Sequence, residues 1–486
     1  MFQTLSDYWP HILVALSLAL GTPAAIHAAM TKEEVRAAIG WVGIIILSPI
    51  AGALIYAIGG INRIRRKSLN LQRDGIAVTA WQGPGPYCCT EDAVRERFGE
   101  AMAAMWRLGN AVSRCRLTNA NDITILETGD EAYKAMLAAI DGAGRSILLE
   151  TYIFDRDAVG ERFVTALSRA AARGVQVSVL IDAVGARYSV PSIVGALREA
   201  GVTTQTFNGN IIMGLRLPYA NLRTHRKILL VDGETAFTGG MNIRAAFSSA
   251  PGAAPSARDT HFRVRGPIIG DLFQTAYEDW RFSGGKKLTG ENWSIQRPSA
   301  EPDEPVFARL VPSGPDRSLE ANHRMLMGAF SVAQERIRIM SPYFLPDREL
   351  ISALATAARR GVAIDIVVPS ANNLKLVDLA MTAQFDQLLK HGCRIWRARG
   401  PFDHSKLMVV DGVWSYVGSS NLDPRSLRLN FEVDVEVIDD DFAAGVEARI
   451  SLALDNAIEV RLEALRARPF LQRLVERVTW LGSPYL

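Results

Sequence analysis

The chain has 486 residues, of which 48% are hydrophobic and 22% charged, and its formal net charge is +3 at neutral pH. This composition excludes a largely disordered chain, and the length exceeds what one ordinary domain holds. The weak positive charge argues against a dedicated nucleic-acid-binding protein, and the cysteines, Cys88, Cys89, Cys115 and Cys393, have the spacing of neither a disulfide framework nor a zinc site.

Two uncharged runs near the amino terminus predict two transmembrane helices. No residue carries a full charge from 8 to 31 or from 37 to 62, and about 20 apolar residues are enough to cross a bilayer. A cleaved signal peptide is the alternative for the first run, but it requires a basic start, and the only charge before the run is Asp7. The basic segment NRIRRK (62–67) favours a cytoplasmic position for both termini.

The remaining chain consists of a connector and one structural unit that occurs twice. In residues 131–182 and again in 320–370, a helical pattern precedes an apolar run typical of a buried strand, and a second helix then ends at Gly174 or Gly361 before another such run. We predict an α/β fold with two tandem α/β sandwich domains of pseudo-twofold symmetry. The expected divisions are a membrane anchor (1–67), a connector (68–120), a first domain (121–300) and a second domain (301–486).

One short motif occurs in both units. Residues 224–242 read THRKILLVDGETAFTGGMN, and residues 403–421 read DHSKLMVVDGVWSYVGSSN. Both copies keep a histidine, a lysine, an aspartate and, after a glycine-containing turn, an asparagine. These residues are His225, Lys227, Asp232 and Asn242 in the first copy and His404, Lys406, Asp411 and Asn421 in the second.

The duplicated motif predicts phosphoryl transfer at one shared site. The alternation of a strand puts each histidine and lysine on the same face. One histidine can bond to phosphorus while the other protonates the departing alcohol and then deprotonates the incoming one. The lysines and asparagines would bind the phosphate oxygens, a role often given to a metal, so we expect no metal and no cofactor. For the aspartates, at the far ends of the strands, we expect a structural role.

Two acidic residues downstream of the motifs are candidates for orienting the histidines through Nδ1. Glu432 lies in the alternating segment LNFEVDVEV, 28 residues after His404, and Asp259 lies in RDTHFRVRG, 34 residues after His225. We expect the neighbouring His261 to face out of its strand rather than to act as a third catalytic histidine.

These motifs resemble those of the phospholipase D superfamily, whose hallmark H-x-K-x4-D is followed by an asparagine. The chain is further similar to bacterial cardiolipin synthases in its two amino-terminal spans, its extended motif stretches and its terminal RLVERVTWLGSPYL. The resemblance implies two phospholipase D-like domains that act as a membrane-bound phosphatidyltransferase. Such an enzyme makes cardiolipin and glycerol from two phosphatidylglycerol molecules through a phosphohistidine, with His225 as the nucleophile and His404 as acid and base.

The resemblance also implies the surroundings of the protein. We expect phospholipid substrates and a membrane as its partners, no nucleic acid, and a multi-pass anchor in the bacterial inner membrane with cytoplasmic catalytic domains. The oligomeric state stays open. A hydrolytic phospholipase D, a membrane-tethered phosphodiesterase or nuclease, and a catalytically inactive scaffold are the alternatives; the intact motifs argue against the last.

Overall fold

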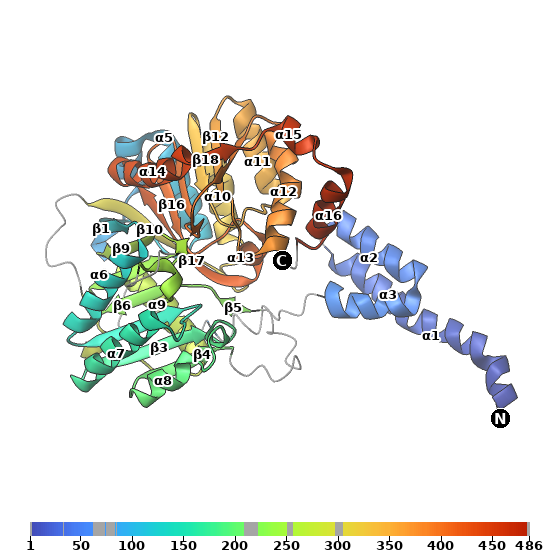
Figure 1. The fold of residues 1–486 in the computed structure, drawn as a ribbon, viewed down its shortest axis with the longest axis horizontal. Coiled ribbons are helices and arrows are strands. Elements are labelled where there is room, and N and C mark those ends of the chain that lie inside the picture. The colour runs from blue at the N-terminus through green and yellow to red at the C-terminus, as the bar shows by residue number, and fades with distance from the viewer. Residues whose placement is uncertain are drawn as a thin grey trace. The chain divides into compact units, whose positions relative to one another are not determined.

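The structure is a computed structural model that describes residues 2–32, 34–61, 73, 83, 85–208, 222–249, 256–296 and 305–483. It divides into two compact units, a small one with the amino-terminal helices and a large one with both repeated segments. Figure 1 labels the helices and strands of each unit.

Of the residues that the structure describes, the amino-terminal unit contains one helix long and apolar enough to cross a bilayer, whereas the sequence predicted two. The unit consists of α1 (Phe2–Thr31), α2 (Val35–Leu47), α3 (Pro49–Ile55) and the π-helical turn η1 (Tyr56–Gly60). The second predicted span is divided at Ser48, because Pro49 has no N–H to donate and displaces the residue before it from helical geometry, here to φ −145° and ψ 79°. The basic segment 62–67 lies outside the described residues.

The large unit is built around one continuous sheet in which the two halves are arranged symmetrically. Its strand order is β18-β13-β12-β11-β15-β16-β17-β10-β1-β9-β7-β6-β2-β3-β4, and β5 pairs with β17 off this path. β1 and β10 pair antiparallel at the centre. Reading outward from either of them gives corresponding strands of the two halves, apart from β18 at one edge.

The elements of the large unit are bounded as follows. The first half has the strands β1 (Thr118–Leu126), β2 (Ser146–Thr151), β3 (Gln176–Asp182), β4 (Thr203–Phe207), β5 (Arg223–Thr224), β6 (Ile228–Val231), β7 (Thr235–Gly239), β8 (Ala257–Arg258) and β9 (His261–Arg265). The connector before it has the helices η2 (Gly85–Tyr87) and α5 (Glu91–Val112), and the half itself has α6 (Gly129–Gly142), α7 (Ala158–Ala172), η3 (Gly185–Arg187), α8 (Ile193–Glu199), η4 (Ala245–Phe247), α9 (Ile268–Phe282) and η5 (Glu291–Trp293).

The second half repeats most of this series and adds β18, α15 and α16 at its end. Its strands are β10 (Val306–Ser313), β11 (Arg336–Met340), β12 (Ala363–Pro369), β13 (Arg394–Ala398), β14 (Phe402–Asp403), β15 (Leu407–Val410), β16 (Trp414–Gly418), β17 (Asn430–Ile438) and β18 (Ala457–Glu459). Its helices are α10 (Ala321–Val332), α11 (Arg348–Arg359), α12 (Lys375–Leu389), α13 (Pro424–Arg428), α14 (Asp440–Asp455), α15 (Leu462–Arg466) and α16 (Phe470–Leu481).

The predicted series of helix, glycine and strand is confirmed in both halves. α7 is followed by Gly174 (φ 91°) and β3, and α11 by Gly361 (φ 97°) and β12. A residue with a Cβ is strained at such angles, so glycine allows each helix to stop and the chain to turn into the sheet. The strands that follow are buried along nearly their whole length.

Each half has its own apolar core, and the connector contributes to one of them. Val94, Met102 and Met105 of α5 belong to the core of the second half, together with residues of α10 and β11. The helical part of the connector is therefore an integral element of the large unit rather than a spacer.

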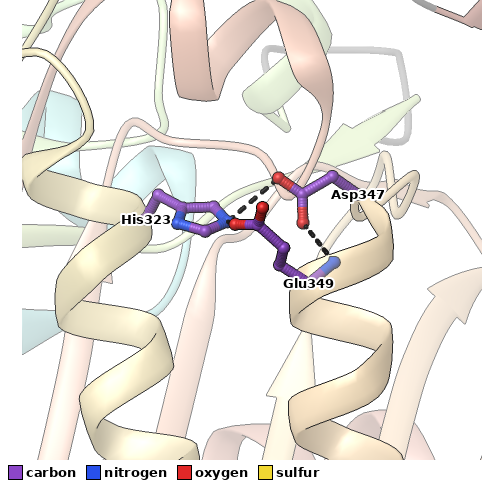
Figure 2. A group of neighbouring side chains, drawn as sticks. All are labelled: His323, Asp347 and Glu349. Atoms are coloured by element: carbon purple, nitrogen blue, oxygen red, sulfur yellow. Dashed lines mark hydrogen bonds and ion pairs between the residues drawn. The ribbon is translucent and has the colours of Figure 1, made fainter. Parts of the chain in front are cut away.

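An ion pair also links α10 to α11 (Figure 2). His323 Nε2 lies 2.9 Å from Asp347 Oδ2 and 3.6 Å from Glu349 Oε2. The other oxygen of Asp347 accepts the N–H groups of Glu349 and Leu350 and so caps α11. The Asp347 hydrogen bond raises the pKa of His323 above its ordinary value, which favours the charged imidazolium at the junction of the two helices.

Candidate active site

Each motif histidine lies in a segment that crosses to the opposite half. β5 ends directly before His225 and pairs in parallel with β17, and the His225 N–H donates to the Phe431 carbonyl at 2.8 Å. β14 ends directly before His404 and pairs in parallel with β8, and the His404 N–H donates to the Arg258 carbonyl at 2.7 Å. Both imidazoles border one cavity of about 400 Å³. The structure therefore brings the two copies of the motif to a shared site.

The two predicted orienting acids also pair across the halves. Nδ1 of His225 lies 2.9 Å from Glu432 Oε2, and Nδ1 of His404 lies 2.8 Å from Asp259 Oδ2. Both carboxylates are fully buried. Along the sequence each acid follows the histidine of its own half. In the fold each histidine instead pairs with the acid of the opposite half. With Nδ1 engaged by a carboxylate, Nε2 is the nitrogen left for substrate.

The two acids have unequal surroundings. Glu432 accepts hydrogen bonds from the Ser419 hydroxyl (2.6 Å) and from the Asn430 amide (3.2 Å). The position that corresponds to Ser419 in the first motif is Gly240, which brings no hydroxyl to Asp259. A Cβ at Gly240 would stand 2.6 Å from Asp259 Oδ1, so the glycine is required by the close approach of the carboxylate. Hydrogen bonds that favour the charged form are thus more numerous at Glu432.

Burial and these partners set different protonation states for the two pairs. Burial would raise the pKa of the Glu432 carboxyl, but the neighbouring His225 and further partners hold this pKa below its ordinary value. Burial lowers the pKa of His225 to about 4. Burial raises the pKa of Asp259 to about 8 and, together with Lys406, lowers the pKa of His404. Near neutral pH, the His225–Glu432 pair is therefore a neutral imidazole beside a carboxylate, whereas the His404–Asp259 pair holds one additional proton.

The predicted phosphate-binding lysines lie behind the imidazoles. Lys227 Nζ donates to the carbonyl of His225 at 2.6 Å, and Lys406 Nζ lies 2.9 Å from Nδ1 of His404 and also donates to its carbonyl. Neither lysine is among the described residues that border the 400 Å³ cavity. Burial lowers the pKa of Lys227 to about 7 and that of Lys406 to about 8. The lysines thus stand next to the histidines with their charge disfavoured by burial, most of all at Lys227, while the cavity wall is made by other groups.

The motif aspartates lie at the far ends of their strands. Asp232 accepts the backbone N–H groups of Gly144, Arg145 and Ser146, each at 2.8 Å. Asp411 does the same for residues 334–336, at 2.7 to 2.9 Å. Each carboxylate ties the turn after β6 or β15 to the start of the neighbouring β2 or β11, which fits the structural role expected from the sequence.

Both predicted asparagines border the cavity. Asn242 Oδ1 accepts the Ile153 N–H at 3.1 Å, which fixes the amide plane and leaves its NH₂ group for a ligand. Asn421 Nδ2 lies 3.4 Å from the Ser426 hydroxyl. The structure therefore brings together the two histidines, their acids and the two asparagines, with the lysines one layer further back.

Three arginines on the cavity wall were missed by the sequence reasoning. Arg223, Arg244 and Arg425 border the cavity; Arg244 also pairs with Asp155 at 2.9 Å. A local signal existed for two of them, because Arg244 follows the first motif asparagine by two residues and Arg425 follows the second by four. Guanidinium groups bind phosphate oxygens in a bidentate manner, so these residues give the cavity the positive charge that binding a phosphate group requires.

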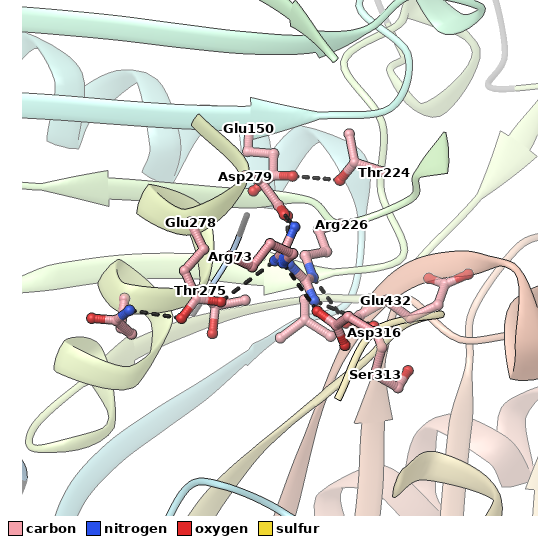
Figure 3. A network of polar contacts seen from close by, with 12 residues as sticks. Arg73, Glu150, Thr224, Arg226, Thr275, Glu278, Asp279, Ser313, Asp316 and Glu432 are labelled. Atoms are coloured by element: carbon pink, nitrogen blue, oxygen red, sulfur yellow. Dashed lines mark hydrogen bonds and ion pairs between the residues drawn. The ribbon is translucent and has the colours of Figure 1, made fainter. Parts of the chain in front are cut away.

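A buried ionic network connects this site to the connector (Figure 3). Arg73 binds Asp279 Oδ1 at 2.6 Å and Asp316 Oδ2 at 3.0 Å. Asp279 also binds Arg226, the residue between the histidine and the lysine of the first motif, and Arg226 Nε donates to the Glu432 carbonyl at 3.0 Å. A guanidinium from the connector thereby supports the backbone that carries the orienting carboxylate.

The expectation that His261 faces out of its strand was wrong. Its exposed fraction is 1%, so it is buried within the large unit instead of facing outward. Burial lowers its pKa to about 3, which makes it a neutral side chain. It occupies the first position of β9 opposite Gly239, and a Cβ at that glycine would stand 2.7 Å from its Nδ1. His261 therefore packs tightly against the neighbouring strand β7 and is shielded from solvent.

Comparison with known proteins finds a family profile and full-length relatives that carry the same name. The sequence profile of a family described as "Cardiolipin synthase, PLD-like domain" matches residues 136–248 and 326–452. The chain is 33% identical over 491 aligned positions to a protein of Pseudomonas fluorescens strain Pf-5 named cardiolipin synthase A, covering 99% of this chain and 100% of that one. It is 32% identical to the protein of the same name from Pseudomonas aeruginosa strain PAO1, covering 100% of this chain and 97% of the relative.

A solved structure shares the fold. The crystal structure of phosphatidylserine synthase from Haemophilus influenzae Rd KW20 superposes with a TM-score of 0.62 at 15% identity, covering 79% of this chain and 100% of that one. An identity this low supports the fold alone. The full-length matches and the paired profile segments together establish that the chain belongs to the cardiolipin synthase family, whose domains are phospholipase D-like.

Proposed function

We propose that this protein is a membrane-bound phosphatidyltransferase that makes cardiolipin and glycerol from two phosphatidylglycerol molecules. The observation that carries the proposal is the shared cavity, in which two imidazoles from opposite halves stand with their Nδ1 atoms on buried carboxylates. The names of the full-length relatives indicate the reaction. The halves 121–300 and 301–486 then work as one catalytic body, because neither holds a complete histidine and acid pair.

The reaction requires one nucleophile and one proton carrier. His225 Nε2 attacks phosphorus, the bond from phosphorus to the glycerol oxygen breaks, and His404 gives its proton to that oxygen. The hydroxyl of a second phosphatidylglycerol then attacks the phosphohistidine, His404 takes the hydroxyl proton, and the N–P bond breaks. The unequal pairs support this assignment, since the neutral His225 has a free lone pair and the His404–Asp259 pair holds a proton near neutral pH.

Charge on the phosphate is met by side chains. Asn242 and Asn421 can donate to the non-bridging oxygens, the cavity arginines can bind the phosphate of the donor or the acceptor lipid, and Lys227 and Lys406 add positive charge behind the histidines. This set of donors performs the electrostatic part of the reaction, so the proposal includes no metal.

We further propose a cytoplasmic-membrane location with both halves on the cytoplasmic side. α1 is long and apolar enough to anchor the chain. The segment after α1 folds back on itself, because the rings of Trp41 in α2 and Tyr56 in η1 lie 5.3 Å apart and Lys32 Nζ donates to the Gly60 carbonyl at 2.5 Å. The basic segment 62–67, which follows η1 in the sequence, favours the cytoplasmic side for the chain beyond it.

The proposal is tested by the lipid products of the purified full-length protein in phosphatidylglycerol vesicles, measured by mass spectrometry. Cardiolipin with an equal amount of glycerol is expected, and His225→Ala should abolish both while the distant His323→Gln retains them. Phosphatidic acid as the main product would instead identify a hydrolase. Cleavage of DNA or a nucleotide diester without lipid turnover would identify a phosphodiesterase.

A further inference from the structure

The carboxy-terminal helix α16 presents an apolar side to solvent. This α16 apolar face consists of Phe470, Leu471, Leu474, Val475, Val478 and Leu481, which are 44% to 73% exposed. The charged Glu476 is only 2% exposed. The spacing of the six residues puts them on one side of the helix, and a contiguous apolar surface of this kind marks a contact with another apolar body.

Packing against α12 and one aromatic ring hold the other side of α16 to the large unit. The buried Glu476 accepts hydrogen bonds from Arg468, just before the helix (2.5 Å), and from Gln472 within it (3.4 Å). Trp480 packs against the apolar core of the second half. The helix lies against α12 (Figure 1). Its orientation is therefore determined by contacts within the fold, and these contacts leave the α16 apolar face outward.

The helix that supports α16 also borders the proposed active site. Leu374, directly before α12, and Val377 on its first turn line the 400 Å³ cavity. Leu374 and Leu376 are 47% and 58% exposed, and Tyr188, another cavity residue, is 57% exposed. Exposed apolar side chains thus lie at the cavity wall and at the start of the helix on which α16 packs.

Charge indicates an anionic bilayer rather than a second copy of the chain. Arg473 and Arg477 are exposed on the same helix as the α16 apolar face, and a helix with one apolar side and basic neighbours is typical of the bilayer interface. In a twofold contact through α16, the arginines of both copies would be gathered at one interface, where like charges repel. Anionic head groups would instead neutralise them. α1 provides a means of holding the chain at the membrane.

We propose that the α16 apolar face docks on an anionic bilayer and holds the cavity mouth at the boundary between lipid and water. The functional part of this inference rests on the proposed lipid transfer, whereas the docking itself does not. A head group could then enter the cavity while the acyl chains stay in the bilayer, so a cavity of this size has no need to enclose a whole lipid.

Docking can be measured directly with a lipid-borne quencher. In the full-length protein with Cys88→Ser, a single fluorescent label is attached at Val475→Cys on α16 or at the control position Leu452→Cys on α14, because these residues are 53% and 56% exposed. Cys89, Cys115 and Cys393 are buried and remain unlabelled. In vesicles of phosphatidylglycerol with brominated acyl chains, the label at 475 should be quenched several-fold more than the label at 452.

The same experiment tests the role of the α16 arginines and the alternative that a second copy of the chain covers the α16 apolar face. Arg473→Gln with Arg477→Gln should reduce the quenching at 475 in anionic vesicles and leave it unchanged in phosphatidylcholine vesicles. Equal quenching at 475 and 452 would overturn the proposal. Energy transfer between labels at 475 on two copies, without lipid quenching, would also overturn it and would identify a dimer contact.

The functional consequence is tested separately. Leu471→Gln with Val475→Gln should slow turnover of bilayer phosphatidylglycerol several-fold and leave turnover of a short-chain, detergent-dispersed phosphatidylglycerol unchanged. Equal losses on both substrates would contradict a docking role. If the unaltered protein turns over neither substrate, the proposed function fails, while the quenching result still decides whether α16 binds the bilayer.

Discussion

Replacing Glu432 by glutamine tests the crosswise pairing of histidines and acids. Glutamine keeps the size of the side chain but removes the negative charge that lies 2.9 Å from Nδ1 of His225. A hydrogen bond to a charged group contributes about 1.5–3 kcal/mol. If this contribution is lost as His225 acquires positive charge on bonding to phosphorus, the first chemical step should slow about 10- to 150-fold. The expected effect lies on the step carried out by His225, in the opposite half from the substitution.

An aryl leaving group separates the two steps. With phosphatidyl-p-nitrophenol, the departing nitrophenolate needs no proton, so the burst of absorbance reports attack by His225 alone. Glu432→Gln should slow the burst, whereas Asp259→Asn should leave the burst nearly intact and slow the later turnover, which needs His404. Glu436→Gln is the matched control, because Glu436 is equally buried on β17 but pairs with Arg309 and Trp414 outside the cavity.

The outcomes are distinct. A slow burst in Asp259→Asn with a normal burst in Glu432→Gln would show that each acid serves the histidine of its own half, or that the two histidines have exchanged roles. An equal loss in Glu436→Gln, measured per folded molecule by thermal melting, would show that burial of charge rather than orientation of the imidazole causes the effect.

Three further predictions concern stability. Asp232→Ala should lower stability by about 2–4 kcal/mol, because three backbone N–H groups lose a charged acceptor, yet turnover per folded molecule should persist; a complete loss would assign the aspartate to catalysis. Arg73→Met should cost about 3–5 kcal/mol by breaking a buried ionic network. Arg95→Met, at a partly exposed arginine whose ion pairs are screened by solvent, should barely change the melting temperature, and equal melting of both variants would contradict the network. His323→Gln should destabilise the protein below about pH 6.5, because the stabilising contribution of a histidine with a raised pKa is fully present there. The difference in stability between the variant and the unaltered protein should vanish as the pH rises through the raised pKa of His323. A difference that does not change with pH would exclude the ion pair with Asp347.

The repeated elements were predictable because their signals are local. The helix, Gly174 and strand of the first half, and the corresponding series around Gly361, follow from apolar periodicity and from the backbone freedom of glycine. The motif histidines were identified by their duplication, and the structural role of Asp232 by its place at the end of a strand. For these residues, neighbours within a few positions along the chain determine the conformation.

Composition and alternation along the chain did not predict the conformation at two places in the structure. The apolar run from 37 to 62 predicted a single span, but Pro49 interrupts the backbone hydrogen bonds and divides it. Likewise, His261 was expected to face outward, because an alternating strand does not reveal that both of its sides are covered; packing within the large unit buries it.

The sequence by itself determined the α/β halves, the two histidines and the two carboxylates that orient them. Only the tertiary structure decided that His225 pairs with Glu432 and His404 with Asp259, because β5 and β14 cross to strands of the opposite half and distance along the chain gives no information about such long-range contacts. It likewise decided that arginines rather than the motif lysines border the cavity. Side-chain direction after a turn depends on the packing around it, which no local pattern specifies.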